Sequence, residues 1–234
     1  MTRISGLAVA LDTTSVDQAQ TWAQQVGPHT TLVKLGLEFY LRNGAAGVAQ
    51  VRQTAPDCGL FLDLKLHDIP ATVAGGARAI GDLQPDVLTV HAAGGTAMVT
   101  AAAAELPDTA IAAVTVLTSL DAAELDQLGL PAAADLVPRW ASTAVAAGAR
   151  AVVASAQEAA SLRAVLGPQP ILITPGIRPA GSAANDQARV ATPAAAIADG
   201  ADVLVVGRPI TTAADPAAAA AEIAAEIAAA QDAQ

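Results

Sequence analysis

Charged side chains interrupt an apolar stretch of the chain, the segment FLDLKLHD at residues 61–68. The segment places Asp63, Lys65 and Asp68 among leucines, in a sequence that is only 15% charged. A lysine in an apolar run loses hydration unless an acid pairs with it. An ammonium group fixed in this way can stabilise negative charge that develops on a substrate and can then donate a proton. The segment therefore predicts a catalytic centre built from acids and lysines.

Further ionisable residues fit the same alternating pattern. Successive side chains of a strand point to opposite faces, so Asp63 and Lys65 lie opposite the leucines of their segment. The same test of parity places Asp12 on the inward face of LAVALD and Lys34 on the inward face of TLVKLG. In a parallel barrel, the inward side chains near the carboxyl ends of the strands form the mouth that carries the chemistry. We expect one alternating set there: Asp12, Lys34, Asp63, Lys65 and Asp68.

Simpler explanations remain open for single members of the set and for two histidines. Asp68 stands shortly before Pro70 and could be a helix N-cap, and Asp12 could equally help to start a helix. His67 and His91 stand at the ends of predicted strands. A lone histidine is weak evidence for a metal, so we expect structural or peripheral positions for both and no metal site.

Two late segments, ITPGIRP and LVVGRPI, place glycine and arginine directly after predicted strands. Barrels often bind phosphate through the loops after their last two strands, using backbone N–H groups and a helix amino terminus. Gly207 and Arg208 fit this role. Arg178 could contact the phosphate or a base, and Gln187 could donate an amide hydrogen bond. The alternative for GRPI is a plain helix start with a solvated arginine.

The elements that must position these residues alternate along the chain. Apolar runs predict strands at residues 5–11, 30–36, 59–65, 86–91, 109–117, 150–154, 170–174 and 202–206. Helical spacing predicts helices at residues 16–26, 38–54, 71–82, 95–104, 134–147, 156–166, 188–199 and from about 212 to the end. This alternation favours a (β/α)8 TIM barrel with residues 1–234 as a single catalytic domain. An open doubly wound sheet would want a glycine-rich turn after the first strand, where the sequence reads LDTTSVD.

Composition limits the partners and the location. The 234 residues carry 12 basic and 22 acidic side chains, a formal charge of −10, and no basic run, so we expect no nucleic-acid partner. Charges and turn formers interrupt each apolar run before the roughly 18 residues that a membrane span needs, so we expect no membrane partner. The single cysteine, Cys58, has no internal disulfide partner and fits a cytoplasmic location.

The segment FLDLKLHDIPATV closely resembles the signature of the orotidine 5′-phosphate decarboxylase family. VALD, VKLG, VTVLTS, ITPGIRP and VVGRPI resemble the other active-site segments of that family, in the usual order. The resemblance spans almost the whole chain. It implies a homodimeric (β/α)8 barrel that removes CO2 from orotidine monophosphate without a cofactor to give UMP, the last step of de novo UMP synthesis.

The resemblance also implies a role for each matching residue of the charged set. Lys65 is implied to be the donor of a proton to the base carbon that loses CO2. Asp63 is implied to lie beside the substrate carboxylate, and Lys34 and Asp12 are implied to contact ribose hydroxyl groups.

Other matching residues are implied to bind the substrate, some of them from a partner subunit. Asp68 and Thr72 would enter the active site of the partner subunit, so that the homodimer shares its active sites. Thr118 resembles a contact near the pyrimidine. The implied phosphate contacts are Arg178, Gln187, Gly207 and Arg208. One departure is Ala71, where the family usually has asparagine, and it puts the local interface contacts in doubt.

Three other functions compete with this interpretation. A related metal-dependent sugar-phosphate decarboxylase or aldolase would place a carboxylate near Lys34 to help hold Mg²⁺, whereas the position is a cation here. A Schiff-base aldolase would want a lysine of lowered pKa in an apolar pocket, but we expect the interleaved acids to hold both Lys34 and Lys65 protonated. A non-catalytic protein that binds a phosphate ligand has no use for the inward pair of Asp63 and Lys65.

Overall fold

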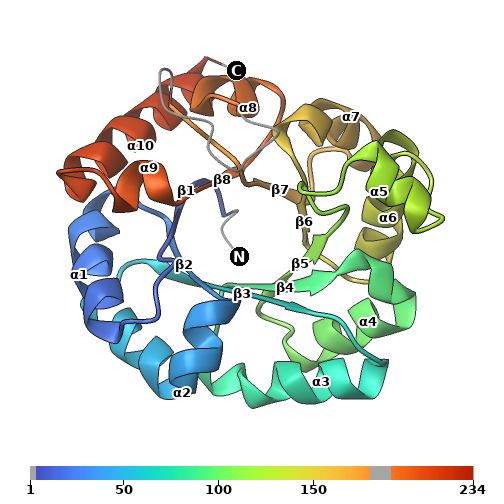
Figure 1. Cartoon of the computed structure of the whole chain (residues 1–234), viewed down its shortest axis with the longest axis horizontal. Coiled ribbons are helices and arrows are strands. Elements are labelled where there is room, and N and C mark those ends of the chain that lie inside the picture. Colours follow the sequence, from blue (N-terminus) through green and yellow to red (C-terminus); the bar gives the residue numbers. More distant parts are fainter. Residues whose placement is uncertain (1–3, 180–190, 234) are drawn as a thin grey trace.

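The computed structural model describes residues 4–179 and 191–233, and its centre is a closed barrel of eight parallel strands (Figure 1). The strands follow one another around the barrel in chain order, and β1 closes the circle by pairing with β8. They are β1 (Gly6–Ala10), β2 (Leu32–Gly36), β3 (Gly59–Leu66), β4 (Val87–His91), β5 (Ala110–Val114), β6 (Ala151–Val153), β7 (Ile171–Thr174) and β8 (Val203–Val206). The predicted (β/α)8 barrel is confirmed, and the open sheet is excluded.

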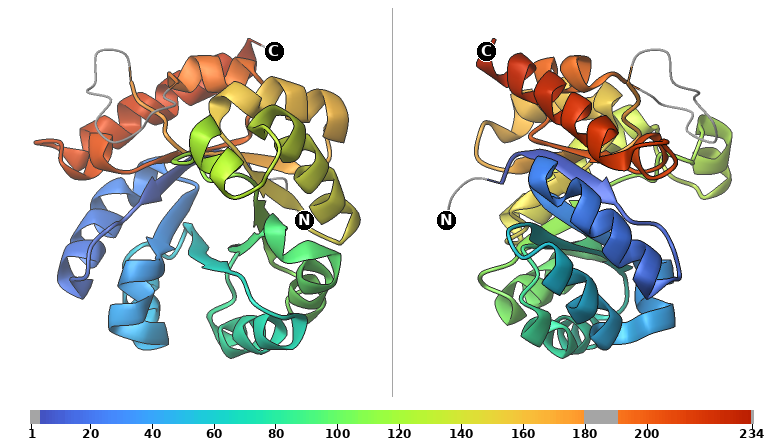
Figure 2. Two further views of the ribbon diagram at one scale, coloured as in Figure 1. Left: turned by 45° about the vertical axis from the view of Figure 1, so that its right-hand side comes forward. Right: turned by 90° about the vertical axis from the view of Figure 1, so that its left-hand side faces the viewer.

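Helices surround the barrel on its outer side (Figure 2). They are α1 (Val16–Val26), α2 (Leu37–Thr54), α3 (Pro70–Ala79), α4 (Gly95–Glu105), α5 (Ala122–Gln127), α6 (Ala133–Ala146), α7 (Ala156–Leu166), α8 (Pro193–Ala198), α9 (Arg208–Thr211) and α10 (Pro216–Asp232). Short 3-10 turns are η1 (Gly27–His29), η2 (Gly81–Leu83) and η3 (Ala92–Gly94). Within residues 4–179 and 191–233, no helix combines the length and the apolar character that a membrane span requires.

Several predicted boundaries were wrong. The strand predicted at 109–117 ends at Val114, and the apolar residues that follow belong to a loop. Val116 is buried in this loop against Leu125 of α5 and Leu136 of α6, so packing against helices explains its apolar character. The prediction omitted α5 and α9. The helix predicted at 188–199 corresponds to α8, which begins at Pro193 and ends at Ala198, and residues 188–190 lie outside the described residues.

The two faces of β3 pack as their parity predicts. Leu60, Leu62 and Leu64 join the core between the strands and the helices. Phe61 belongs to a second apolar cluster of strand residues, with Ala8, Leu32, Val87, Ala110, Ala112, Ala151, Ile173 and Val203. Phe61 and Asp63 lie on the same inward face of β3. The packed interior around Phe61 therefore supports the charged side chains nearer the carboxyl end of the strand.

The observed helix starts exclude the N-cap explanation for two acids. Ser15 caps α1 by accepting a hydrogen bond from the backbone N–H of Gln18 at 3.2 Å, so Asp12 is not the cap. Ile69 precedes α3 and makes no side-chain cap bond, so Asp68 is not the cap either. Pro70 occupies the first turn of α3, as predicted.

Candidate active site

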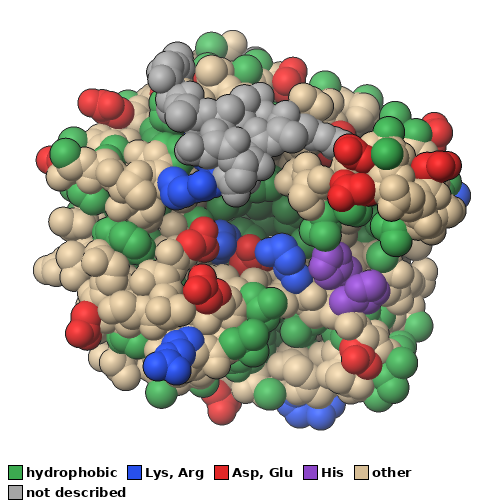
Figure 3. Space-filling view, in the orientation of Figure 1, with side chains coloured by type: hydrophobic (Ala, Val, Ile, Leu, Met, Phe, Trp, Pro, Cys, Tyr) green, Lys and Arg blue, Asp and Glu red, His purple; other side chains and the backbone are tan. Residues whose placement is uncertain are grey.

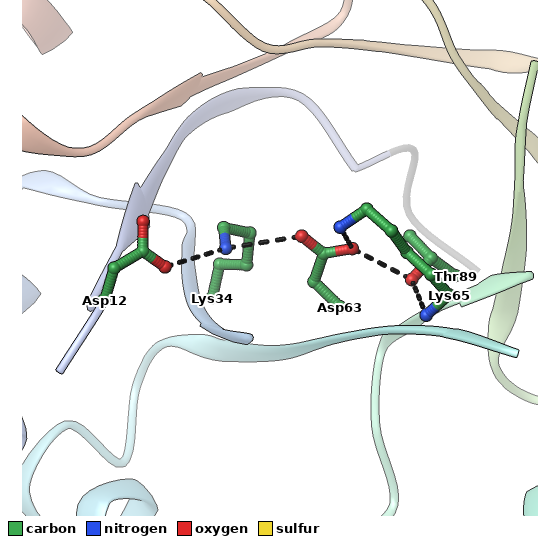
Figure 4. Close-up of polar contacts among 5 residues, drawn as sticks. All are labelled: Asp12, Lys34, Asp63, Lys65 and Thr89. Atoms are coloured by element: carbon green, nitrogen blue, oxygen red, sulfur yellow. Dashed lines mark hydrogen bonds and ion pairs between the residues drawn. The ribbon is translucent and has the colours of Figure 1, made fainter. Parts of the chain in front are cut away.

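A row of alternating acids and lysines crosses the mouth of the barrel (Figure 4). Lys34 Nζ lies 3.2 Å from Asp12 Oδ1 and 3.3 Å from Asp63 Oδ2. Lys65 Nζ lies 2.7 Å from the other carboxylate oxygen of Asp63, Oδ1. Strands β2 and β3 position the two central residues, while Asp12 follows the end of β1. The set predicted from parity therefore forms one connected ion-pair chain, except for Asp68.

Exposure differs along the row. The side chains of Lys34 and Asp63 are 9% and 14% exposed, whereas those of Lys65 and Asp12 are 38% and 63% exposed. The inner pair is therefore fixed within the protein, while the two outer side chains can reach a ligand in the pocket.

Each member of the inner pair holds the other in its charged form. Burial would by itself raise the pKa of the Asp63 carboxyl, but attraction to Lys34 and Lys65 and hydrogen bonds from Lys65 and Thr89 together lower it below its ordinary value. Burial would likewise lower the pKa of Lys34, and attraction to Asp63 and Asp12 raises it above its ordinary value instead. The buried Lys34 is thus unsuited to Schiff-base chemistry, which needs a neutral amine.

Thr89 on β4 completes the row and was not predicted. Its hydroxyl donates to Asp63 Oδ1 at 2.9 Å and accepts from the Lys65 backbone N–H at 2.9 Å. Lys65 itself has a φ of 50°, an uncommon conformation for a residue with a side chain. The sequence holds a signal that could have found Thr89, because it shares the inward parity of Val87 within the apolar strand VLTVH.

The row lies along one side of a pocket of about 270 Å³. Figure 3 shows acidic and basic side chains gathered in the hollow at this face of the molecule. The opposite wall is largely apolar and includes Val114, Val116, Leu117, Val153, Ala154 and Ile173. Thr118, which was predicted to lie near a pyrimidine, also lines the pocket. A pocket with a charged side and an apolar side suits a planar, partly polar ligand.

The segments predicted to bind phosphate meet at the same pocket. Arg178, Gly207 and Arg208 all line it, together with Pro175 and Gly176. Arg178 is 7% exposed, and its backbone N–H donates to the carbonyl of Ala191 at 2.9 Å. α9 begins at Arg208, so GRPI is a helix start, which was the alternative explanation for this segment. Arg208 also lines the pocket, so the two explanations hold together. Gln187 lies outside the described residues.

Asp68 and Thr72 do not line the pocket of their own chain. Both are exposed, and Asp68 Oδ1 accepts the backbone N–H of Ile69 at 2.7 Å. Ile69 itself is 66% exposed although it is large and apolar. The geometry of a single chain therefore does not bring these two residues to the row.

His67 and His91 pack against each other beside the row, with ring centroids 5.2 Å apart and ring planes tilted by 36°. Burial lowers the pKa of His91, and the nearby His67 and Lys65 lower it further. Neither ring lines the pocket. In the described part of the chain, no three or more His, Cys, Asp and Glu side chains are grouped so that they could hold a metal ion.

A comparison with protein families shows the family of the chain. The model of the "Orotidine 5'-phosphate decarboxylase / HUMPS family" matches residues 5–223. The chain belongs to this family. Among curated members of the orotidine 5′-phosphate decarboxylase family, the Thermobifida fusca protein is 61% identical over 222 residues, with 94% of this chain and 95% of the relative covered. The protein of the same name from Frankia casuarinae is 51% identical, with 96% of this chain and 88% of the relative covered.

Solved structures of the orotidine 5′-phosphate decarboxylase family share the fold. The crystal structure of the Lactobacillus acidophilus orotidine 5′-phosphate decarboxylase superimposes with a TM-score of 0.84 at 35% identity, covering 95% of this chain and 99% of that one. The Pyrococcus horikoshii enzyme gives a TM-score of 0.79 at 25% identity, covering 95% and 99%. The resemblance inferred from the sequence motifs is thus confirmed at the level of family and fold.

Proposed function

We propose that the protein is an orotidine 5′-phosphate decarboxylase, which converts orotidine monophosphate to UMP and CO2 as the last step of de novo UMP synthesis in the cytoplasm. The observation that carries the proposal is the row from Asp12 to Lys65, which lies along one side of a pocket also lined by Gly207 and Arg208. The curated relatives bear the name of this enzyme. The charged row and the residues proposed to bind the phosphate, Arg178, Gly207 and Arg208, line the same pocket.

Lys65 is proposed as the proton donor. Breaking the bond between the pyrimidine carbon and the carboxylate releases CO2 and leaves the electron pair on the carbon. A cofactor-free enzyme must stabilise that charge with its own groups. The Lys65 ammonium is partly exposed to the pocket and is anchored by Asp63 at 2.7 Å, so it can attract the developing charge. It then transfers a proton to the carbon, which gives UMP and a neutral amine.

Repulsion between Asp63 and the substrate carboxylate is expected to be a smaller effect. Two unit charges about 4 Å apart interact by roughly 4 kcal/mol at an effective dielectric constant near 20, which corresponds to about three decades of rate. Both carboxylate oxygens of Asp63 are paired with lysines, Oδ2 with Lys34 and Oδ1 with Lys65, so the repulsion is reduced further. Stabilisation of the transition state by Lys65 is therefore the larger contribution.

The remaining pocket residues are proposed to bind the non-reacting parts of the nucleotide. Asp12 and Lys34 would contact the ribose hydroxyl groups, and Thr118 would lie near the pyrimidine. The proposed phosphate contacts are Arg178, Gln187, Gly207 and Arg208. Binding energy from the phosphate can organise the reacting end, because remote contacts can be used to orient the substrate for the reaction.

A shared active site in a homodimer is also proposed. Asp68 and Thr72 are exposed and do not line the pocket of their own chain, which suits residues that act across an interface. The neighbouring Ile69 is 66% exposed, and burial of such an apolar side chain stabilises association. Ala71, the departure from the family pattern, lies between Asp68 and Thr72 in the sequence and does not line the pocket.

An optical assay with orotidine monophosphate tests the function. The decrease in absorbance as UMP forms is expected with the purified protein, and it is expected to be unchanged by EDTA. Loss of turnover in EDTA would favour the metal-dependent sugar-phosphate chemistry, for which the buried cation Lys34 occupies an unsuitable position. Tight binding of UMP without turnover would instead indicate a nucleotide-binding protein.

A further inference from the structure

We infer that Thr89 is a positioning residue for the reaction, whose hydroxyl fixes both the Asp63 carboxylate and the backbone of Lys65. The inference rests on the proposed decarboxylation for its catalytic consequence. Its structural part, the double hydrogen bond, can be tested without turnover.

The hydroxyl group joins two members of the charged row (Figure 4). It donates to Asp63 Oδ1 at 2.9 Å and accepts from the Lys65 backbone N–H at 2.9 Å. A hydroxyl has one donor and two acceptor lone pairs, so both bonds can exist together. Thr89 is only 1% exposed, and water therefore does not replace the hydroxyl in either bond.

The hydroxyl acts where the pairing of the strands is irregular. Leu62 pairs with Leu88 and Leu66 pairs with Val90, so the residues from Asp63 to Lys65 face Thr89 alone. The irregularity includes the left-handed backbone of Lys65, with φ of 50°. Such a conformation is disfavoured for a residue with a side chain and persists when its surroundings hold it. The bond from the Lys65 N–H to Thr89 supplies such a contact.

The same oxygen of Asp63 receives both the Thr89 hydroxyl and the Lys65 ammonium. Oδ1 lies 2.7 Å from Lys65 Nζ, while Oδ2 lies 3.3 Å from Lys34 Nζ. Without the hydroxyl, Asp63 loses one bond that fixes its rotation about the axis between the two lysines. The Lys65 ammonium and its backbone then lose a common anchor, although the residues that grip the phosphate are untouched. The expected result is a loss of turnover with little loss of nucleotide affinity.

Two substitutions separate the hydroxyl from the shape of the side chain. Thr89→Val keeps the shape and removes the hydroxyl, whereas Thr89→Ser keeps the hydroxyl. Thr109→Val is a matched control, because Thr109 is also buried, at 5% exposure, and its hydroxyl donates to the carbonyl of Pro85 away from the pocket. All variants are compared with the wild-type protein by kcat, KM and affinity for UMP.

A loss of about 100-fold in kcat is expected for Thr89→Val, the size of effect that a misplacement of about 1 Å can cause. KM and UMP affinity are expected to change by less than about threefold, because the binding contacts persist. Thr89→Ser and Thr109→Val are expected to retain kcat within about fivefold. Equal losses in Thr89→Val and Thr89→Ser would show that the side chain only fills space and would overturn the inference.

Hydrogen exchange of the Lys65 amide, followed by NMR, tests the contact independently of turnover. Exchange is expected to be at least about tenfold faster in Thr89→Val than in the wild-type protein, and unchanged in Thr89→Ser and Thr109→Val. Unchanged exchange in Thr89→Val would overturn the inference even if the enzyme is active. If the wild-type protein does not decarboxylate orotidine monophosphate, the proposed function is wrong, and the exchange result still decides the role of Thr89. If Thr89→Val does not fold, Thr89→Ala replaces it in the same comparison with Thr89→Ser.

Discussion

The Lys65 ammonium lies 2.7 Å from Asp63 Oδ1 while 38% of the side chain remains exposed. Lys34, by contrast, is buried between two acids at 3.2 and 3.3 Å. Both lysines line the pocket, but Lys65 is the more exposed of the two, and Lys34 also holds the two carboxylates in place. This difference in exposure supports the proposed role of Lys65 as the proton donor.

Lys65→Ala is expected to lose nearly all turnover and to keep its affinity for UMP, because the role proposed for the lysine lies chiefly in the transition state. The measurement is kcat with orotidine monophosphate, together with UMP binding by calorimetry. Arg42→Ala serves as a control, since Arg42 is an exposed cation on α2 that does not line the pocket. A kcat near that of the wild-type protein would remove Lys65 from the mechanism.

Asp63→Asn is expected to lower the free energy of unfolding by about 3 kcal/mol at neutral pH, because Lys34 loses a buried partner. The pKa of Asp63 is lowered from its ordinary 3.8, so its carboxylate stabilises the fold above that pH, and the contribution is lost as the pH falls through the folded-state pKa. Urea unfolding from pH 3 to 8 should give a constant difference from wild type above about pH 5 and a smaller one below 3.8.

The control for the pH series is Glu105→Gln. Glu105 pairs with Arg78 at 2.6 Å on the surface, where water and salt screen the charges. The change in stability is expected to be small and to depend on salt concentration. A difference between Asp63→Asn and the wild-type protein that grows as the pH falls from 7 to 4 would contradict the assigned direction of the Asp63 pKa shift.

Most of the charged row could be predicted from the sequence, because parity along each strand decides which side chains point inward. Asp12, Lys34, Asp63 and Lys65 were found in this way. The left-handed backbone of Lys65 could not be predicted, since it depends on the register between β3 and β4. Thr89 was missed because a neutral hydroxyl in an apolar strand does not show that it faces a carboxylate.

At the scale of elements, strand β3 separates the charged row from the apolar layer beneath the helices. Leu62 is 0% exposed and belongs to the core between strands and helices, on the face opposite Asp63. The bounds of two helices, α1 and α7, are the same as those predicted from the sequence. The strand predicted at 109–117 was too long, because a buried loop and a buried strand have the same apolar composition.

Leu62→Ala is expected to lower the free energy of unfolding by about 2 to 5 kcal/mol, since it leaves a cavity between β3 and the helices. Leu41→Ala is the matched control, because Leu41 on α2 is 75% exposed, and its substitution is expected to change stability by less than about 0.5 kcal/mol. Both values come from denaturant unfolding followed by circular dichroism. Equal effects of the two substitutions would refute the assignment of the leucine face to the core.

At the scale of the whole molecule, the proposed dimer makes a quantitative prediction. Lys65→Ala and Asp68→Ala protomers, each inactive alone, are mixed so that subunits exchange. Half of the dimers are then mixed, and each mixed dimer has one site with both substitutions and one with neither. About a quarter of wild-type activity is expected if Asp68 serves the site of the partner subunit in a twofold symmetric assembly.

Two differently tagged chains that purify together provide the control for exchange. With exchange demonstrated, activity no greater than the sum of the two parents would rule out the shared site. Asp68 would then act within its own subunit or at the surface. The exposed Ile69 beside it offers a second probe, because Ile69→Lys is expected to weaken association as measured by analytical ultracentrifugation.

The pairing of β1 with β8 also determines how long one edge of β1 stays unpaired while the chain is being synthesised. Val9 of β1 pairs with Val206 of β8, and about 200 residues separate them. At about 5 to 20 residues per second, a ribosome needs roughly 10 to 40 s to make the intervening chain. During that time one edge of β1 has no strand to pair with, and an unpaired edge can join a neighbouring chain. Nascent chains on crowded polysomes are therefore most exposed to mispairing until β8 has emerged.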